Sequence, residues 1–444
     1  MKILISRRQF LLSSLVTGTA TVQSCALPLV HGKKLRHAAI AVGGMGAHDL
    51  GQIASHPNVV ITALCDIDSG RLDEAHKNYP GARIYQDWRK LLKMERGRLD
   101  SVHISCPDHM HAPIAMESLR QGLHVYCQKP LTHTVVEARR LTETAKKRGV
   151  VTQMGIQNHS GKHYRQALEI FQTGITGPVH TAHVWTDRPA GWWPQNVERS
   201  DSQDAIPKEL DWNGWLGVAP DRPFVKGAYH AFAWRGRLDF GTGAQGDMAC
   251  HLMDPVPWFL GVRQPLQVTS EGPKPNAESY PEWSKVSYQF PATEKTGKHG
   301  VQVTWHDGGR KPEELLKEHG FTEKVYANAC LFIGEQGALL TSPYESCLFA
   351  EKGGTPKTPT LPDVPDINHW HQFVNACLGQ GKTLASFDYA GPLTEIALLG
   401  NVALNFPNQK LTWNAEELKF TNHADANDLL HKSYRKGWEV RGLE

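Results

Sequence analysis

The chain has 444 residues, which at about 150 residues per domain predicts two or three domains. Hydrophobic residues make up 40% of the chain and charged residues 21%, a balance that excludes a mainly disordered protein. The formal net charge is +3, and Lys2, Arg7 and Arg8 are the only charged residues among the first 31, so the rest is neutral. This balance gives no electrostatic case for nucleic acid or a membrane surface as a partner.

The first 31 residues predict an export signal. Arg7 and Arg8 are followed by Phe-Leu one residue later and then by a weakly apolar run over residues 12–22, a pattern that resembles a twin-arginine signal. The run is too short to cross a bilayer, and no later stretch is longer, so no membrane span is expected. Cys25 follows a small residue and is a candidate lipid-anchor site, with ordinary cleavage near Ala26 as the alternative. A periplasmic protein or a membrane-anchored lipoprotein is therefore expected.

The next segment has the pattern of a dinucleotide-binding unit. An apolar run over residues 37–42 ends in the turn Gly43-Gly44-Met45-Gly46, and a helical pattern follows over 47–55. A second apolar run, 59–64, leads to Asp66, which lies 20 residues after Gly46, as the Rossmann fingerprint requires. Glycines let the backbone approach a pyrophosphate, and a helix N-terminus favours its negative charge.

The acid at the end of the second strand indicates which cofactor binds. The carboxylate of Asp66 suits the adenosine ribose hydroxyls and repels a 2′-phosphate, so NAD is expected and NADP is less favoured. One position departs from the fingerprint, because Ala41 replaces its first glycine. We expect Ala41 to make the turn with a negative φ.

Strand and helix patterns continue to alternate along the chain. Strands are predicted over 99–106, 124–127 and 150–155, and helices over 111–121 and 135–148. Such alternation predicts a parallel, doubly wound sheet, whose ligands lie at the carboxyl ends of the strands. Beyond the glycine turn and Asp66, these ends carry Pro107-Asp108, Gln128-Lys129-Pro130 and Gln157-Asn158.

The pattern changes from about residue 158, where strand-like runs appear at 179–186, 285–290, 300–305 and 330–334. They indicate an antiparallel or mixed sheet. The predicted fold is α/β, with an N-terminal Rossmann domain over 33–157 and an α+β domain with a mostly antiparallel sheet over 158–444. A helix over Tyr389–Leu404 is expected to pack back at the domain boundary.

Three motifs in order resemble the family of glucose–fructose oxidoreductase, inositol dehydrogenase and MocA (Gfo/Idh/MocA) over about residues 35–405. Cys127-Gln128-Lys129-Pro130 is similar to the Glu-Lys-Pro motif of the family, with Gln128 in place of the glutamate. Pro107 to His111 is similar to its P-x-x-x-H turn, and Asp247 to His251 matches its Asp-x-x-x-His pair.

The resemblance implies roles for individual residues. It places Lys129 beside the nicotinamide and the substrate hydroxyl, and it gives Asp247 and His251 the handling of the proton, with His251 as base or acid and Asp247 orienting it. His111, on a loop-to-helix turn, could cap the helix or contact the cofactor, and we expect it near the nicotinamide. Asp254 extends the pair to a spacing that also suits metal ligands. Because the resemblance already accounts for Asp247 and His251, no metal is expected.

Seven of the 13 tryptophans lie between residues 185 and 258. Aromatic faces stack on the apolar faces of sugar rings, and large aromatics also fill cores and subunit interfaces. Together with Asn158, we expect Trp192, Trp193, Trp234 and Arg235 to contact the substrate, while core packing remains the alternative for each tryptophan.

The sequence thus predicts an exported NAD-dependent oxidoreductase that acts on a secondary hydroxyl of a carbohydrate. Free nicotinamide cofactor is not expected outside the cytoplasm, so the cofactor must be tightly held and reset in place. The alternative is an NAD-dependent glycoside hydrolase or lyase that works through a transient 3-keto sugar, as some relatives do. A homo-oligomer is expected by analogy with the family.

Overall fold

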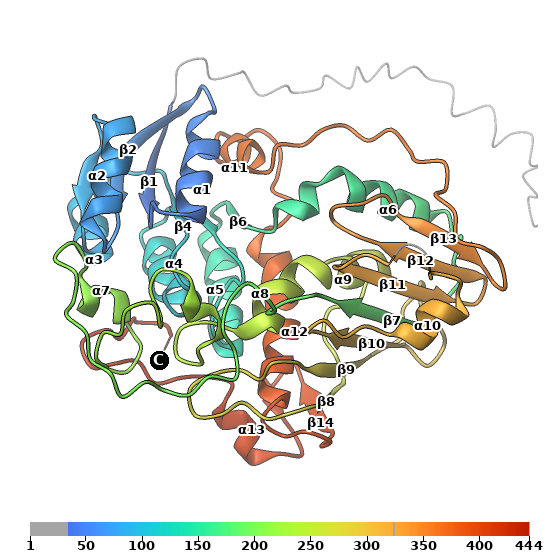
Figure 1. Ribbon diagram of the computed structural model, residues 1–444. Coiled ribbons are helices and arrows are strands. Elements are labelled where there is room, and N and C mark those ends of the chain that lie inside the picture. The colour runs from blue at the N-terminus through green and yellow to red at the C-terminus, as the bar shows by residue number, and fades with distance from the viewer. Residues whose placement is uncertain (1–33, 323–324, 444) are drawn as a thin grey trace, which may run out of the picture. The chain divides into compact units, whose positions relative to one another are not determined.

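The computed structural model describes residues 34–322 and 325–443, and the predicted export signal, including Arg7, Arg8 and Cys25, lies outside them. The described residues form two sheets with helices packed on them (Figure 1). None of their helices is long and apolar enough to cross a membrane.

The first sheet has six strands in the order β3-β2-β1-β4-β5-β6, and every neighbouring pair is parallel. This is the strand order of a Rossmann fold, and it confirms the predicted fold class. The strands are β1 (Leu35–Ile40), β2 (Val59–Cys65), β3 (Arg83–Tyr85), β4 (Ser101–Ile104), β5 (His124–Cys127) and β6 (Thr152–Met154).

The helices of this domain connect the strands. They are α1 (Met45–Ala54), α2 (Ser69–Asn78), α3 (Trp88–Met94), α4 (His111–Arg120) and α5 (Val135–Arg148), with short 3₁₀ turns η1 (Asp108–Met110) and η2 (Gln157–Ser160). Local sequence sets the ends of α5: Thr134 and Glu137 form a capping box, and three basic residues fill the last turn.

The second sheet has nine strands in the order β13-β12-β11-β7-β10-β9-β8-β14-β15. Its neighbours pair in antiparallel fashion except β7 and β10, which are parallel. The strands are β7 (Val179–Trp185), β8 (Gln267–Glu271), β9 (Lys285–Phe290), β10 (Val301–His306), β11 (Ala329–Gly334), β12 (Gly337–Thr341), β13 (Leu348–Glu351), β14 (Leu411–Asn414) and β15 (Lys419–Phe420).

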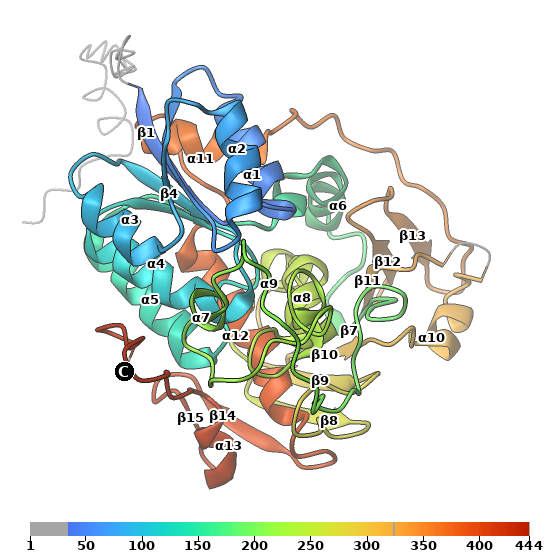
Figure 2. The ribbon, with the colours of Figure 1, turned by 60° about the vertical axis from the view of Figure 1, so that its left-hand side comes forward.

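The remaining helices surround this sheet or join it to the first domain. They are α6 (Lys162–Gln172), α7 (Trp212–Leu216), η3 (Ala233–Gly236), α8 (Gly243–Leu252), α9 (Pro255–Leu260), α10 (Glu313–Glu318), α11 (His369–Cys377), α12 (Phe387–Ala403) and α13 (Ala424–Asp428). Helix α12 lies close to the predicted range 389–404 and packs against α5, α8 and β8, between the two halves of the molecule (Figures 1 and 2).

Two late segments return to the first domain. Helix α11 packs on α1, where His371 Nε2 lies 2.8 Å from Ser55 Oγ. The segment 430–443 runs beside α4 and α5, and the amide of Val136 donates to the carbonyl of Leu430 (Figure 2). One continuous apolar core joins both sheets through α12. The Rossmann domain is therefore completed by residues that follow β13 of the second sheet.

The glycine turn shows one departure from expectation. Ala41 has a φ of 67°, so the expected negative φ was wrong. The turn requires the left-handed region here because the chain reverses under α1, where a Cβ on Gly46 would lie 2.0 Å from the carbonyl oxygen of Ala41. Only glycine fits at position 46, and alanine at position 41 is strained.

We predict that Ala41→Gly stabilises the protein by about 1 kcal/mol, because the left-handed conformation costs a side chain about that much. Chemical denaturation would measure the free energy of unfolding. Ala39→Gly, in the buried middle of β1, is the matched control and should destabilise by about 0.5–1 kcal/mol or more. An Ala41→Gly variant no more stable than the parent would show that the turn is unstrained.

Candidate functional site

A cleft of about 680 Å³ opens at the carboxyl ends of β1, β2, β4 and β5. This is the edge at which parallel α/β sheets bind ligands. The second domain supplies the opposite wall from α8 and the segment 214–235. Predicted site residues that line the cleft are Gly43, Gly44, Met45, Asp66, Pro107, Lys129, Gln157, Trp234, Arg235, Asp247 and His251.

The adenosine end of a dinucleotide fits the part of the cleft near Asp66. One oxygen of its carboxylate accepts from the amide of Val42 at 2.8 Å, and the other accepts from the amide of Asp68 at 3.0 Å. Burial raises the pKa of this carboxyl, which is 6% exposed, and the two amides oppose that rise. Arg71 lines the same end, and its side chain lies where a Cβ on Gly43 would be. The glycine turn and the oriented acid together fit NAD.

The predicted catalytic residues meet at the other end of the cleft. Lys129 Nζ lies 2.8 Å from Asp247 Oδ1 and donates to the Asp247 carbonyl at 3.0 Å. Arg235 Nε lies 3.4 Å from the same carboxylate oxygen. The ion pair joins the loop after β5 to α8, so the two domains build this site together.

The two charged partners determine how Asp247 titrates. Burial alone would raise the pKa of Asp247, but the charges of Lys129 and Arg235 outweigh it and hold the pKa below its ordinary value. Burial lowers the pKa of His251 to about 3, with a further contribution from the charge of Lys129. At neutral pH the site therefore holds an ionised aspartate and a neutral imidazole, whose Nδ1 is buried without a hydrogen-bond partner in the described residues.

The structure gives Asp247 a different partner from the one expected. Its carboxylate pairs with Lys129 and Arg235. Among the hydrogen bonds of the described residues, none joins this carboxylate to His251. Asp247 therefore positions the lysine more directly than it positions the imidazole.

Several predicted residues do not line the cleft. Gly46 lies beneath the turn, and Asn158 lies in η2 outside the lining. Trp192 is 51% exposed, and the Cζ atom of Arg188 lies 3.6 Å from the centre of its ring. Trp193 is buried and donates to Gln195. Trp193 thus packs in the interior, the alternative considered from the sequence, whereas Trp192 lies at the surface against Arg188.

His111 was expected near the nicotinamide, and the structure places its ring behind the wall of the cleft. Nδ1 lies 2.7 Å from the carbonyl oxygen of Pro130, and Nε2 lies 2.8 Å from that of Cys106. His111 is fully buried and lies outside the cleft lining. It joins the loops after β4 and β5, and so positions Lys129 and Pro107 instead of contacting a ligand.

Asp254 is turned away from His251. Both of its carboxylate oxygens lie 2.9 Å from His159 Nδ1, and Tyr389 donates to one of them at 2.5 Å. In the described part of the chain, no group of three or more histidine, cysteine, aspartate or glutamate side chains could hold a metal ion.

One segment of the second domain lines the cleft over a long stretch that was not predicted from the sequence. We call residues 207–235 the roof segment. The amide of Ser69 donates to the carbonyl of Glu209 at 2.8 Å, and the amide of Asp211 donates to that of Ile67 at 2.9 Å. The roof segment is therefore fastened directly to the start of α2, beside Asp66. Its aromatic residues signalled a pocket, but these backbone bonds have no sequence signature.

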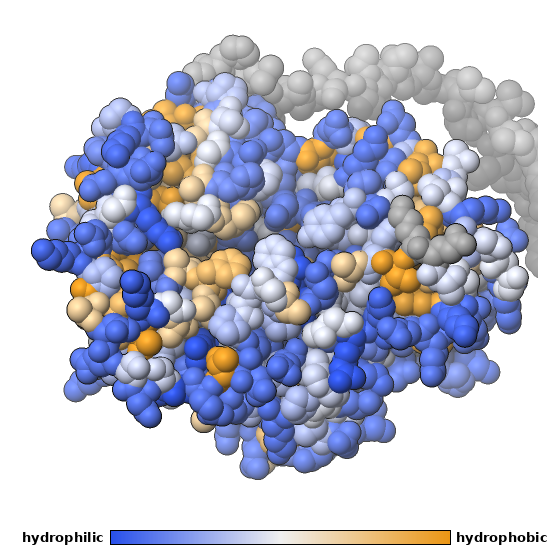
Figure 3. Space-filling view, in the orientation of Figure 1, coloured by the Kyte–Doolittle hydropathy of each residue, from blue (hydrophilic) through white to orange (hydrophobic). Residues whose placement is uncertain are grey.

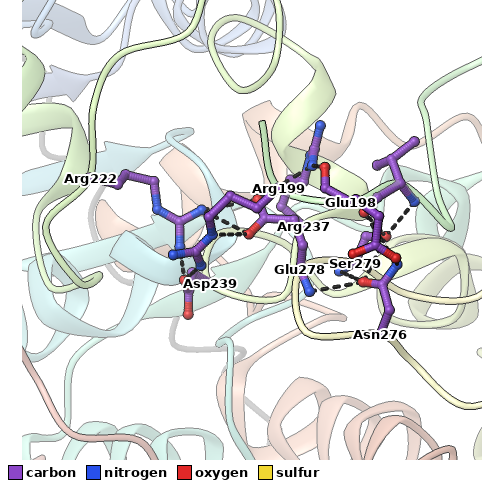
Figure 4. Close-up of polar contacts among 9 residues, drawn as sticks. Glu198, Arg199, Arg222, Arg237, Asp239, Asn276, Glu278 and Ser279 are labelled. Atoms are coloured by element: carbon purple, nitrogen blue, oxygen red, sulfur yellow. Dashed lines mark hydrogen bonds and ion pairs between the residues drawn. The ribbon is translucent and has the colours of Figure 1, made fainter. Parts of the chain in front are cut away.

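An ionic network ties Arg222 of the roof segment to Glu278 (Figure 4). Glu278 accepts from Arg199 at 2.8 Å, from Arg222 at 3.0 Å and from Arg237 at 3.4 Å. Asp239 pairs with Arg222 as well. Arg222 and Arg237 flank Trp234 and Arg235 in sequence, so the network fixes the chain on both sides of two cleft residues.

Another missed feature explains Gln128, the departure from Glu-Lys-Pro. Its side-chain amide donates to Asp49 Oδ2 at 2.9 Å. Asp49 is buried in α1 and also accepts from Ser105 Oγ at 2.7 Å and Trp370 Nε1 at 2.8 Å. The carboxylate beside the lysine loop is thus supplied by α1, and glutamine is the residue that can donate to it.

We predict that Gln128→Glu destabilises the protein by about 1–3 kcal/mol, because two buried carboxylates would face each other without a proton donor between them. Adding Asp49→Asn should recover most of this loss, since the asparagine amide then donates to the introduced carboxylate. Thermal and chemical denaturation of the two single variants and the double variant would measure the coupling. A double variant no more stable than Gln128→Glu alone would contradict this pairing.

The Rossmann sheet, its fingerprint acid and the cleft shared with a second sheet define a two-domain dinucleotide-binding protein. Residues 35–156 match the description "Oxidoreductase family, NAD-binding Rossmann fold", and residues 172–328 match "Oxidoreductase family, C-terminal alpha/beta domain", both of Gfo/Idh/MocA. The chain belongs to the Gfo/Idh/MocA oxidoreductase family, and its cofactor is NAD.

Curated relatives match over part of their length. Inositol 2-dehydrogenase of Salmonella typhimurium is 29% identical over 188 residues, which are 41% of this chain and 54% of that protein. Glycosyl hydrolase family 109 protein 1 of Shewanella sp. (strain MR-4) is 28% identical over 149 residues, 32% of each chain. The chain thus matches about half, or less, of the length of these relatives.

Solved structures match over most of the chain. WlbA dehydrogenase of Bordetella pertussis, solved with NADH and UDP-GlcNAcA, has a TM-score of 0.61 at 16% identity and covers 86% of this chain and 99% of its own. At this identity the likeness concerns the fold. It extends across both domains, as the two family matches do.

Proposed function

We propose that the protein is an exported oxidoreductase that acts on a secondary hydroxyl of a sugar, sugar derivative or glycoside and keeps its NAD bound. The observation that carries the proposal is the meeting of Lys129, Asp247 and His251 in the cofactor cleft. Bound NAD would supply the hydride acceptor. The proposed location rests on Arg7 and Arg8, and the proposed substrate class is that of relatives named for inositol and UDP-GlcNAcA.

Each residue of the triad has a role that its surroundings support. The ammonium of Lys129, held by Asp247, polarises the reacting oxygen. His251 is neutral at physiological pH, so its imidazole accepts the hydroxyl proton as the alcohol becomes a ketone. Asp247 stays ionised beside two cations and balances the charge that develops on the imidazole. Trp234 and Arg235 form the wall that faces the sugar.

A second candidate function is the NAD-dependent cleavage of a glycoside through a transient ketone. The roof segment favours it, because a cofactor enclosed by backbone hydrogen bonds suits a reaction in which the hydride returns to the same substrate. The similarity to a glycosyl hydrolase family 109 protein supports this alternative.

The protein should be purified in its mature form, and any nucleotide released on denaturation should be identified by mass and absorbance. We expect stoichiometric NAD or NADH, and we expect Lys129→Met and His251→Asn to lower turnover of sugars about 10²–10⁴-fold with the nucleotide content unchanged. Trp192→Phe, outside the cleft, is the control and should retain turnover. Full turnover by the double Lys129 and His251 variant would refute the catalytic assignment, and bound NADP would refute the role of Asp66.

We also predict that the roof segment slows cofactor release. Ser69 is the first residue of α2, where a helix tolerates proline, so Ser69→Pro removes the amide that donates to Glu209 and leaves the helix intact. Loss of one hydrogen bond of about 1 kcal/mol should speed NADH release about five-fold. Stopped-flow fluorescence against excess NAD would measure the rate.

Ser69→Ala is the matched control, because it removes the same hydroxyl and keeps the amide. It should release NADH at the parent rate. Equal rates for the proline and alanine variants would show that the contact with Glu209 does not retain the cofactor.

A further inference from the structure

The cleft holds a fourth titratable group, Asp108, to which neither the motifs nor the proposed function assigns a role. It begins η1, directly after β4, and lines the cleft together with Lys129, Asp247 and His251. The residue is 1% exposed. Its position at the carboxyl end of a central strand places it where ligands of this fold bind.

The two oxygens of the Asp108 carboxyl differ in their surroundings. Oδ2 accepts a hydrogen bond from Thr242 Oγ1 at 2.7 Å, and Oδ1 is buried with no hydrogen-bond partner among the described residues. Thr242 immediately precedes α8, the helix that carries Asp247 and His251. One oxygen is thus fixed by the catalytic helix, and the other is left for a ligand, because buried polar atoms in native proteins normally have a partner.

The charges around Asp108 favour its protonated form. Burial raises its pKa to about 7, and the negative charge of Asp247 adds to the rise, while Thr242, Lys129 and Arg235 oppose it. Lys432 and the phenol of Tyr280 also face Asp108, as do the thiols of Cys106, Cys127 and Cys250. Asp108 and Asp247 line one cleft with pKa values shifted in opposite directions, the arrangement that separates an acid from a charged partner.

We propose that Asp108 is the proton donor for the leaving oxygen when this protein cleaves a glycoside. The inference deepens the second candidate function and rests on it. An oxidoreductase that only interconverts an alcohol and a ketone needs one proton acceptor, and His251 already fills that role. A second buried acid in the same cleft is needed only in a reaction with a leaving group, to which it donates a proton.

Before the cleavage step, His251 releases to the solvent the hydroxyl proton that it accepted during the oxidation, so that its imidazole is neutral again. The carbon–hydrogen bond next to the transient ketone then breaks, and its proton passes to His251. Its electron pair forms a carbon–carbon double bond to the anomeric carbon. The bond from the anomeric carbon to the leaving oxygen then breaks with its electrons on that oxygen. The O–H bond of Asp108 breaks, its proton joins the same oxygen, and an alcohol leaves. The Asp108 carboxylate that remains faces Lys129 and Arg235, which stabilise it.

The first test needs no substrate. The infrared difference between the NAD-loaded parent and NAD-loaded Asp108→Asn should contain the carbonyl band of a protonated carboxylic acid, and this band should titrate near pH 7. A difference spectrum with only carboxylate bands at pH 6 would overturn the proposal.

The second test compares leaving groups. Methyl and p-nitrophenyl glycosides of the same sugar, taken across hexoses and N-acetylhexosamines, are the probes. Nitrophenolate leaves without a proton, so Asp108→Asn should lower kcat/KM about 100-fold or more for the methyl glycoside and only a few-fold for the nitrophenyl glycoside. Thermal stability and nucleotide content of the variant serve as checks of the fold.

The third test is a pH profile. The kcat/KM for the methyl glycoside should fall as the pH rises through about 7, because the acid loses its proton. Thr242→Val removes the hydrogen bond that stabilises the carboxylate, so this limb should move to higher pH. Asp108→Asn should abolish the limb.

The outcomes separate the two proposals. Equal losses for the two glycosides, or an alkaline limb unmoved by Thr242→Val, in a protein that contains NAD would overturn the role of Asp108 alone. NAD-loaded parent protein that oxidises sugars and cleaves neither glycoside would overturn it too. A protein that contains no nicotinamide nucleotide would instead refute the proposed function, and the role of Asp108 with it.

Discussion

The ion pair between Lys129 and Asp247 is the contact on which the site depends. The lysine follows β5 of the Rossmann sheet, and the aspartate lies in α8 of the second domain. Each residue would be costly to bury alone, since an unpaired charge in a low-dielectric interior is strongly destabilising. Paired, they bring the wall that carries His251 up to the edge where NAD binds. The position of one domain against the other and the chemistry of the cleft are therefore set by the same contact.

Apolar packing holds that contact in register. Helix α12 is buried over almost its whole length and packs against α5, α8 and β8. The apolar core is therefore continuous from one sheet to the other. The face seen in Figure 3 is mostly hydrophilic, and its apolar residues form small separate patches. The continuous apolar core lies inside the molecule, where it keeps the cleft walls in a fixed relation. Gln128 at the cleft is held by Asp49 behind it, which also accepts from Ser105 and Trp370, and these bonds add to the rigidity.

The features of the fold and of the site that could be predicted are those that depend on residues close together in the sequence. The strand over 124–127 and the helix over 135–148 were predicted at their observed bounds because hydrophobic periodicity and capping residues define them. The fingerprint acid and the three motifs were also local signals, and they gave most of the cleft. Trp192, Trp193 and His111 lie outside the cleft lining, because composition does not say which way a side chain points. Asp108 was noted only as a polar residue at a strand end, since its burial and its free oxygen arise from Thr242, far along the chain.

The return of α11 and the segment 430–443 to the first domain has a consequence for biosynthesis. The Rossmann half is translated first, yet α1 lacks its cover until His371 and its neighbours emerge from the ribosome, and α5 lacks its partner until Leu430 follows. Part of the apolar surface of the first domain therefore stays uncovered until these later residues have been made. The first domain is begun before the second sheet, yet it cannot be completed until the chain has passed through that sheet.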